Sequence, residues 1–298
     1  MHNATSDAAS NVEQLARTLA AAMPVSPDVS RLIQLAIDAG QITLTLRDAG
    51  IGWRTKEDGS VVTRADEDAE ALILAGLADL APDVPVVAEE RTARGDTDGT
   101  ANAATTSFFL VDALDGTSEY VKGRDEFTVN IARIENGAPA MGVVVCPALA
   151  RGFVGADGAA WSFKITDGAA NGFARISVRT CTAPPTAVIS RSHASPETLA
   201  FVDTLGNCDC VSFGSSLKLC RLADGTADVY PRLGRTMEWD IAAGHAVLAS
   251  AGGCVLTRDG QPLSYGKAVQ PDDAPYANPH FVAFGHWPDR DVAALARA

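Results

Sequence analysis

The stretch that decides the expected fold is FFLVDALDGT, residues 108–117. An apolar run of this length predicts a buried strand, and the Asp-Gly pair after it predicts a tight turn where the strand ends. That turn would present the carboxylates of Asp112 and Asp115 together with the carbonyl group of Leu114. Carboxylate and carbonyl oxygens suit Mg²⁺ or Mn²⁺, and Mg²⁺ usually keeps coordination positions open for a substrate phosphate. The stretch therefore predicts a metal site at the end of a strand.

The same turn is suited to an anion. Gly116 lets the backbone approach a ligand closely, and Thr117 and Ser118 are expected to form the N-cap region of a helix whose amides face a phosphate. Metal and phosphate would then share one turn of the chain.

The spacing of the two Asp residues separates two phosphatase chemistries. Enzymes of the haloacid dehalogenase class place a nucleophilic Asp two positions before the second Asp, where this chain has Ala113. A phosphoaspartate mechanism would lack its nucleophile, so direct attack by metal-bound water is the better interpretation. Taken alone, the two Asp residues can also be ordinary turn residues, because Asp is common beside Gly in turns.

Composition narrows the class of protein. The chain has 298 residues, which predicts one compact unit with two lobes or two closely joined domains, and its 47% of hydrophobic residues is typical of a soluble globular protein. Its formal net charge is −13. The charge argues against a nucleic-acid polymer or an anionic membrane as partner, whereas bound metal ions can still attract a small anionic substrate. We find no signal-peptide pattern and no apolar run long enough to span a bilayer, and we expect the six scattered cysteines to be reduced. These features predict a cytoplasmic protein.

The order of elements predicts an α/β fold with two parts. Residues 1–180 are expected to form an α+β lobe with most of the metal ligands, and residues 181–298 an α/β lobe in which strands and helices alternate. The expected helices are those within residues 10–48, with a break near Pro24 and Pro27, and those at 67–80, 197–205, 217–223 and 240–251. The expected strands are those at 85–88, 108–111, 127–134, 141–145, 152–154, 176–178, 187–190, 211–213 and 229–231, with a hairpin at Asn136-Gly137. Residues 91–107 are expected to be a loop.

Further motifs resemble one family. In chain order they are TRAD (63–66), EE (89–90), VDALDGT (111–117) and EWDIAAG (238–244). Together they resemble the metal-site motifs of the inositol monophosphatase-like, lithium-sensitive phosphatase superfamily, over about residues 33–281. The segments 123–132, 190–193, 214–218 and 230–232 are similar to those of its bacterial 3′(2′),5′-bisphosphate nucleotidase branch.

The resemblance implies a layered α/β/α/β/α sandwich and a set of site residues. Metal ligands would be Glu89, Asp112, the carbonyl of Leu114, Asp115 and Asp240, with Asp66 serving a weaker third ion. The catalytic residues would be Asp66, Glu89 and Thr117, which orient the attacking water. Substrate would be bound by Gly116, Thr117, Ser190, Arg191, His193, Ser215, Lys218 and Arg232. Two to three Mg²⁺ ions are implied, with Mn²⁺ as a substitute.

The implied activity is Mg²⁺-dependent removal of the 3′-phosphate from adenosine 3′,5′-bisphosphate, which gives AMP and phosphate. An inositol or sugar monophosphatase would share the metal ligands but needs no site for a second phosphate. A non-catalytic metal or phosphoinositide-binding protein is the alternative from another class. The partner would be a small phosphorylated substrate, and the protein a monomer or a homodimer.

Two features depart from the pattern or lie outside it. Ala113 stands where the family usually has Pro, which should loosen the turn slightly without removing a ligand. His245, one helical turn beyond Asp240, is expected to be packed or hydrogen-bonded, and Trp239 to pack behind the metal site.

Overall fold

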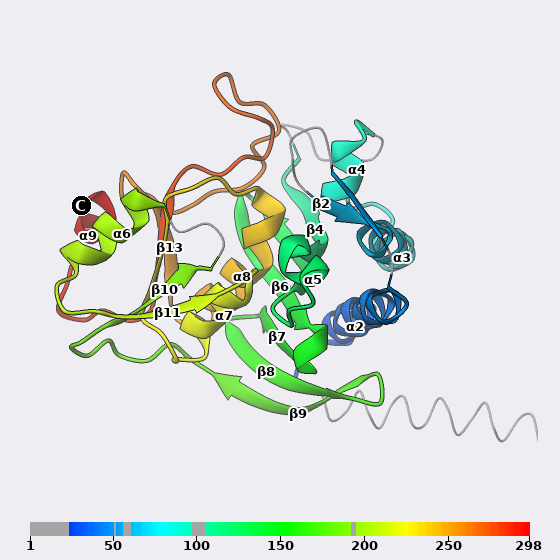
Figure 1. Ribbon diagram of the computed structural model, residues 1–298, viewed down its shortest axis with the longest axis horizontal. Coiled ribbons are helices and arrows are strands. Elements are labelled where there is room, and N and C mark those ends of the chain that lie inside the picture. The colour runs from blue at the N-terminus through cyan, green and yellow to red at the C-terminus, as the bar shows by residue number, and fades with distance from the viewer. Residues whose placement is uncertain (1–23, 51, 56–60, 97–104, 192–194) are drawn as a thin grey trace, which may run out of the picture.

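The computed structural model describes residues 24–50, 52–55, 61–96, 105–191 and 195–298. They form five layers, in the order helices, sheet, helices, sheet, helices (Figure 1). The expected α/β/α/β/α sandwich is thereby confirmed. In the described part of the chain, we find no helix that is both long and apolar enough to cross a membrane.

The first sheet has seven strands in the order β3-β4-β5-β6-β7-β8-β9. Their bounds are β3 Val86–Ala88, β4 Ser107–Asp115, β5 Thr128–Glu135, β6 Ala138–Cys146, β7 Arg151–Ala156, β8 Ala159–Thr166 and β9 Ala169–Ile176. Strands β3 and β4 are parallel, and the other neighbours are antiparallel. Strand β4 is buried on both faces because helices cover both sides of the sheet, which explains its unbroken apolar run.

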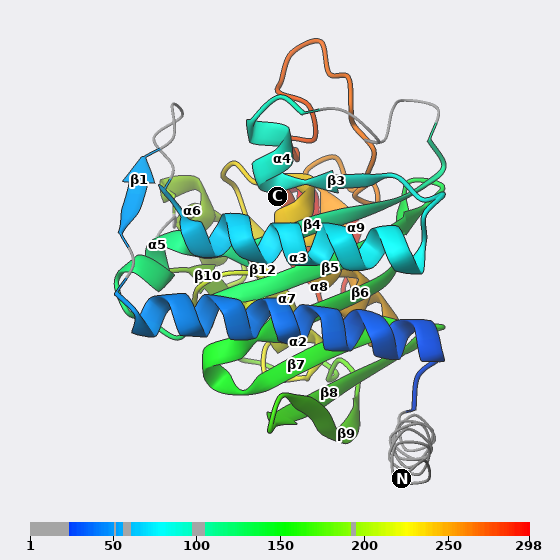
Figure 2. The same cartoon turned by 90° about the vertical axis from the view of Figure 1, so that its right-hand side faces the viewer.

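Two long helices cover the outer face of this sheet, α2 (Pro27–Asp48) and α3 (Arg64–Leu80) (Figure 2). Ser26 caps α2 with its side-chain oxygen, and Pro27 occupies the first helical turn, where its missing N–H costs no hydrogen bond. In α3, Thr63 and Asp66 form a capping box, in which the side chain of each residue accepts a hydrogen bond from the backbone N–H of the other. The buried faces of α2 and α3 pack on Phe109, Val111 and other side chains of this face of the sheet.

The central layer consists of α7 (Leu217–Ala223) and α8 (Glu238–Ser250). Helix α8 is buried on nearly every side and is mostly apolar, as expected for a helix that lies between two sheets. A Cβ added to Gly142 of β6 would lie 2.3 Å from the carbonyl oxygen of Ala243 in α8. Glycine is therefore required there for the close approach of helix and strand.

The second sheet has the order β11-β10-β12-β14-β13. Its strands are β10 Thr186–Ser190, β11 Asp209–Phe213, β12 Val229–Arg232, β13 Cys254–Thr257 and β14 Phe281–Phe284, and α6 (Pro196–Thr204) and α9 (Val292–Arg297) pack on its outer face. The remaining elements are the hairpin of β1 (Trp53–Thr55) and β2 (Val61–Thr63), the short helices α4 (Glu89–Ala93) and α5 (Thr117–Val121), and a 3₁₀ turn at Pro147–Leu149.

Several expected elements need correction. Residues 91–93 are not loop, because they complete α4, and residues 97–104 of the expected loop lie outside the described residues. The strand expected at 176–178 is wrong beyond Ile176, where β9 ends. Strands β8, β13 and β14 and most of β9 were not expected, and the expected helical pattern before Pro24 lies outside the described residues. Helix α8 begins at Glu238, which places Asp240 in its first turn.

Candidate active site

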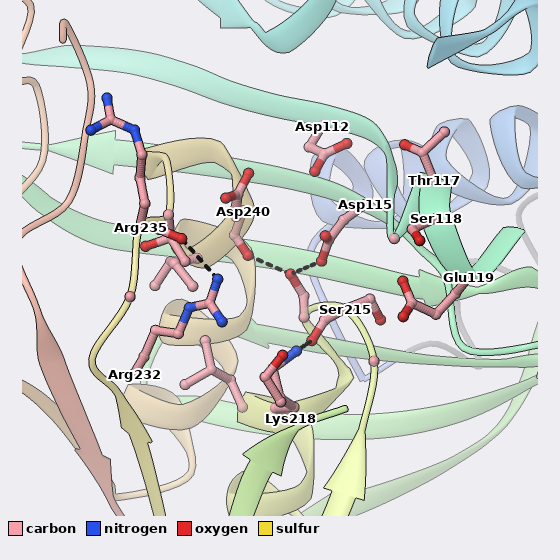
Figure 3. A pocket seen from close by; sticks show the side chains of 18 of the residues that line it. Asp112, Asp115, Thr117, Ser118, Glu119, Ser215, Lys218, Arg232, Arg235 and Asp240 are labelled. Carbon is pink, nitrogen blue, oxygen red and sulfur yellow. Dashed lines mark hydrogen bonds between the residues drawn. The ribbon is translucent and has the colours of Figure 1, made fainter. Parts of the chain in front are cut away.

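A cavity of about 780 Å³ opens where the ends of both sheets meet the central helices. Side chains from the β4 turn, from the segment after β11 and from the start of α8 point into it (Figure 3). The predicted site residues that line it are Glu89, Asp112, Leu114, Asp115, Gly116, Thr117, Ser190, Ser215, Lys218, Arg232 and Asp240. The structure therefore brings most of the predicted set to one place.

Three of the carboxylates that line this cavity form an acidic cluster. Glu89, Asp112 and Asp240 each offer one carboxylate oxygen, and these oxygens lie within 4.8 Å of one another. They come from the start of α4, from β4 and from the start of α8, so distant parts of the chain supply them. Carboxylates that converge in this way suit a hard divalent cation.

The electrostatics of the cluster support that fit. Burial, and then the neighbouring Glu89, Asp115 and Asp240, raise the pKa of Asp112 well above its usual value. Burial, followed by Asp115 and Glu89, does the same to the pKa of Asp240. Neighbouring carboxylates that raise one another's pKa are strongly stabilised by a cation between them. The cation offsets the repulsion that otherwise favours their protonated form. The residues present therefore fit a divalent metal ion.

Asp115 lies beside the cluster. Burial raises its pKa, while the Lys218 ammonium and a hydrogen bond from Ser216 oppose that rise. The Ser216 hydroxyl lies 3.1 Å from Asp115 Oδ2 and 2.5 Å from the carbonyl oxygen of Asp240. Ser216 therefore joins two of the predicted ligand residues, one from strand β4 and the other from helix α8.

A buried glutamate holds the start of α4, and with it Glu89. Glu70 of α3 accepts a hydrogen bond from Glu90 N at 2.7 Å and pairs with Arg94 at 3.1 Å. Burial raises the pKa of Glu70 to about 7. These contacts fix the backbone next to Glu89 from the side of α3.

Asp66 and Thr117 form a pair at the edge of the acidic cluster. Thr117 Oγ1 lies 3.1 Å from Asp66 Oδ1 and 3.2 Å from the carbonyl oxygen of Leu114. The other carboxylate oxygen of Asp66 accepts from the backbone N–H and the hydroxyl of Thr63, at 2.8 and 2.7 Å. Burial raises the pKa of Asp66 to about 6, and nearby Glu89 adds to the rise. The capping box thus orients Asp66 toward Thr117.

The turn after β4 differs from the expected cap. Gly116 is the N-cap residue of α5, with a φ of 92°, and no side chain caps this helix. Thr117 and Ser118 are its first helical residues, so a helix begins where it was expected, but the capping residue is Gly116. A residue with a side chain would be strained at that φ, which is why glycine follows Asp115.

Two cations, Lys218 and Arg232, also line the cavity. Burial lowers the pKa of Lys218 to about 8, and its ammonium donates to the carbonyl oxygen of Ser215 at 2.5 Å. Arg232 donates through Nη2 to the carbonyl oxygen of Arg235 at 2.8 Å, while its buried Nε has no hydrogen-bond partner among the described residues. A buried donor without a partner is costly, so this guanidinium is suited to an anionic ligand.

Two predicted substrate residues are not brought to the cavity. Arg191 pairs with Glu126 at 2.8 Å and donates to the carbonyl oxygen of Ser212 at 2.9 Å, so it does not line the cavity. Its expected contact with the nucleotide stays a prediction. His193 lies outside the described residues.

Sequence reasoning missed several cavity residues. The lining residues not predicted include Val61, Ser118, Glu119, Ser195, Gly214, Ser216, Tyr230, Arg235 and Thr236. Gly214 and Ser216 lie within a motif that was recognised, so a complete use of segment 214–218 would have found them. Arg235 is three residues beyond Arg232 and pairs with Asp273 at 2.7 Å, a contact with no signal in the local sequence.

The expectations for His245 and Trp239 are confirmed. His245 Nδ1 lies 2.9 Å from the hydroxyl of Tyr265, and both rings are buried. Trp239 packs in the central core between the two sheets.

Comparison with known proteins agrees with this geometry. The inositol monophosphatase family model matches residues 24–279. The 3′(2′),5′-bisphosphate nucleotidase CysQ of Salmonella typhimurium is 41% identical over 239 residues, which cover 80% of this chain and 93% of that protein. The crystal structure of CysQ from Bacteroides thetaiotaomicron is 31% identical, covers 89% of this chain and 97% of that chain, and has a TM-score of 0.69. An inositol monophosphatase from Anabaena shares the fold at 23% identity, with 89% and 92% coverage and a TM-score of 0.63. The chain belongs to the inositol monophosphatase family.

Proposed function

We propose that this protein is a Mg²⁺-dependent phosphomonoesterase that hydrolyses the 3′-phosphate of adenosine 3′,5′-bisphosphate to give AMP and phosphate. One observation carries the proposal: a single cavity is lined both by a carboxylate cluster and by the cations Lys218 and Arg232. A doubly phosphorylated nucleotide needs both, because one phosphate reacts at the metals and the other needs positive charge. The similarity to proteins named CysQ nucleotidases supports the same choice.

The metal ions would be held by Glu89, Asp112, Asp115, Asp240 and the carbonyl oxygen of Leu114. Asp66 would serve a third, weaker ion, and Mn²⁺ would substitute for Mg²⁺. When bound, the ions supply a water of lowered pKa and stabilise charge on the leaving oxygen.

Asp66 and Thr117 would orient the attacking water. If the Thr117 hydroxyl donates to Asp66 Oδ1, 3.1 Å away, its lone pairs remain free to accept a hydrogen bond from water. Thr63 holds the Asp66 carboxylate in place through two further hydrogen bonds. The backbone amides of Gly116 and Thr117 would face the reacting phosphate.

The second phosphate would lie between Lys218 and Arg232, with Ser190 and Ser215 beside it. Lys218 is held against the carbonyl of Ser215, and the orphaned Nε of Arg232 would gain a partner when the phosphate binds. A charge-assisted contact of this kind contributes roughly 1.5–3 kcal/mol.

Steady-state hydrolysis with Mg²⁺ tests the proposal directly. Adenosine 3′,5′-bisphosphate, adenosine 3′-phosphate and inositol 1-phosphate would be compared by kcat/KM. We expect the bisphosphate to be preferred. A preference for inositol 1-phosphate would favour an inositol monophosphatase, and a protein that binds metal but hydrolyses none of the three would favour a non-catalytic role.

A further inference from the structure

The guanidinium of Arg191 takes part in a contact that crosses from one sheet to the other. Glu126 precedes β5 of the first sheet, whereas Arg191 and Gly214 directly follow β10 and β11 of the second. Because β10 and β11 are parallel neighbours, their carboxyl ends lie at the same edge of the sheet and face Glu126 together. The contact is therefore a link between distant parts of the chain.

Glu126 receives two donors through one oxygen. Its Oε2 accepts from Arg191 Nη1 at 2.8 Å and from the backbone N–H of Gly214 at 2.8 Å. Arg191 also donates through Nη2 to the carbonyl oxygen of Ser212 at 2.9 Å, and its backbone N–H donates to the carbonyl oxygen of Phe213. We call Glu126, Arg191 and Gly214 the clamp.

Packing leaves little freedom at this point. A Cβ added to Gly214 would lie 2.9 Å from the carbonyl oxygen of Glu126 and 3.2 Å from Glu119 Cγ. Gly214 is thus packed closely against Glu126 as well as hydrogen-bonded to its side chain.

The segment that the clamp holds carries cavity groups. Ser215 has a φ of 49°, a left-handed conformation that is unfavourable for a residue with a side chain and must be held by its surroundings. Its carbonyl oxygen accepts from Lys218, and the next residue, Ser216, contacts Asp115 and the carbonyl of Asp240. A shift of Gly214 would move all of these groups relative to the acidic cluster.

We propose that Glu126 and Arg191 are positioning residues that fix the Gly214–Ser216 turn in its substrate-binding conformation. Neither residue lines the cavity, so the effect acts through the turn. The inference rests on the proposed function, since it takes that turn to bind the substrate.

The test compares Glu126→Ala, Glu126→Gln and Arg191→Ala with wild type, using adenosine 3′,5′-bisphosphate and Mg²⁺. We expect Glu126→Ala to raise KM by about tenfold with a much smaller change in kcat, because a buried N–H loses its acceptor. Glu126→Gln keeps an oxygen for Gly214 N–H and should recover most of that loss. Arg191→Ala should raise KM by about threefold, and adding it to Glu126→Ala should have little further effect because the two residues act together.

Arg133→Ala is the matched control, since Arg133 pairs with Glu135 at 3.2 Å on the same strand and does not line the cavity. Its KM should equal that of wild type. Unchanged KM in both Glu126 variants, or a loss that Glu126→Gln fails to recover, would overturn the positioning role. So would a fall in thermal stability without any change in KM. If wild type prefers inositol 1-phosphate, the proposed substrate fails, and the same comparison of KM on that substrate decides the inference separately.

Discussion

Replacement of Arg232 by Met tests how the cavity distinguishes one phosphate from two. Arg232 Nη2 is already used by the carbonyl oxygen of Arg235, at 2.8 Å, while the buried Nε has no partner among the described residues. Met keeps most of the apolar stem of the side chain and removes the charge. The variant therefore isolates the charged contact from the packing of the side chain.

The expected loss follows from the strength of a charge-assisted hydrogen bond. Removing one such contact costs roughly 1.5–3 kcal/mol, or about a 10- to 150-fold fall in kcat/KM for adenosine 3′,5′-bisphosphate. For adenosine 3′-phosphate, which has the same base, sugar and reacting group but no second phosphate, we expect a fall of less than about threefold. Arg232 is a cleaner probe than Lys218, because Lys218 is the strongest influence that lowers the pKa of the predicted ligand Asp115, whereas Arg232 has only a minor effect on the pKa of Asp240.

The assay is phosphate release at saturating Mg²⁺, with Arg175→Met as a control. Arg175 is an exposed arginine on β9 that lies over the ring of Trp161, away from the cavity. Equal losses on the two nucleotides in Arg232→Met would refute the reasoning. That result would mean that Arg232 acts through the metal ligands instead of on the second phosphate.

Three further predictions concern the metal, the core and the thiols. Asp112→Asn should lower kcat/KM by more than about 100-fold and weaken Mn²⁺ binding in calorimetry, and full wild-type activity in excess chelator would contradict the metal mechanism. His245 has a pKa lowered from 6.5 to about 4 by burial, so the unfolded chain takes up its proton first and stability is lost as the pH falls from about 6.5 toward 4. Between pH 7 and pH 5, wild type should lose about 2 kcal/mol more unfolding free energy than His245→Asn in urea titrations, and equal losses would show that burial does not hold the imidazole neutral. Joint replacement of Cys208 and Cys210 by Ser should leave the hydrolysis rate within about twofold, because neither thiol lines the cavity; a large loss of rate would reveal a role that the geometry does not provide.

Some hairpins could have been predicted but were missed. Asp157-Gly158 joins β7 to β8, and Asp167-Gly168 joins β8 to β9, with positive φ at all four residues. Such Asp-Gly pairs are a strong hairpin signal. The flanking segments contain many Ala residues and alternate weakly, which hid the strands.

The sequence by itself determined the local parts of the site. The buried strand before Asp112, the tight turn at Gly116 and the capping box of Thr63 and Asp66 all depend on neighbouring residues, through burial, backbone sterics and side-chain hydrogen bonds to nearby amides. The motifs also indicated which carboxylates belong together.

Only the tertiary structure decided which residues meet. Glu89, Asp112 and Asp240 converge because β3 and β4 end close to the start of α8, and no local pattern encodes that distance. In the same way, the ion pair of Arg191 with Glu126 could not be predicted, since an arginine pairs with whichever carboxylate the packing of the two sheets brings within reach. Caps and turns are chosen by residues a few positions apart, whereas ion pairs and metal ligands depend on how distant elements pack.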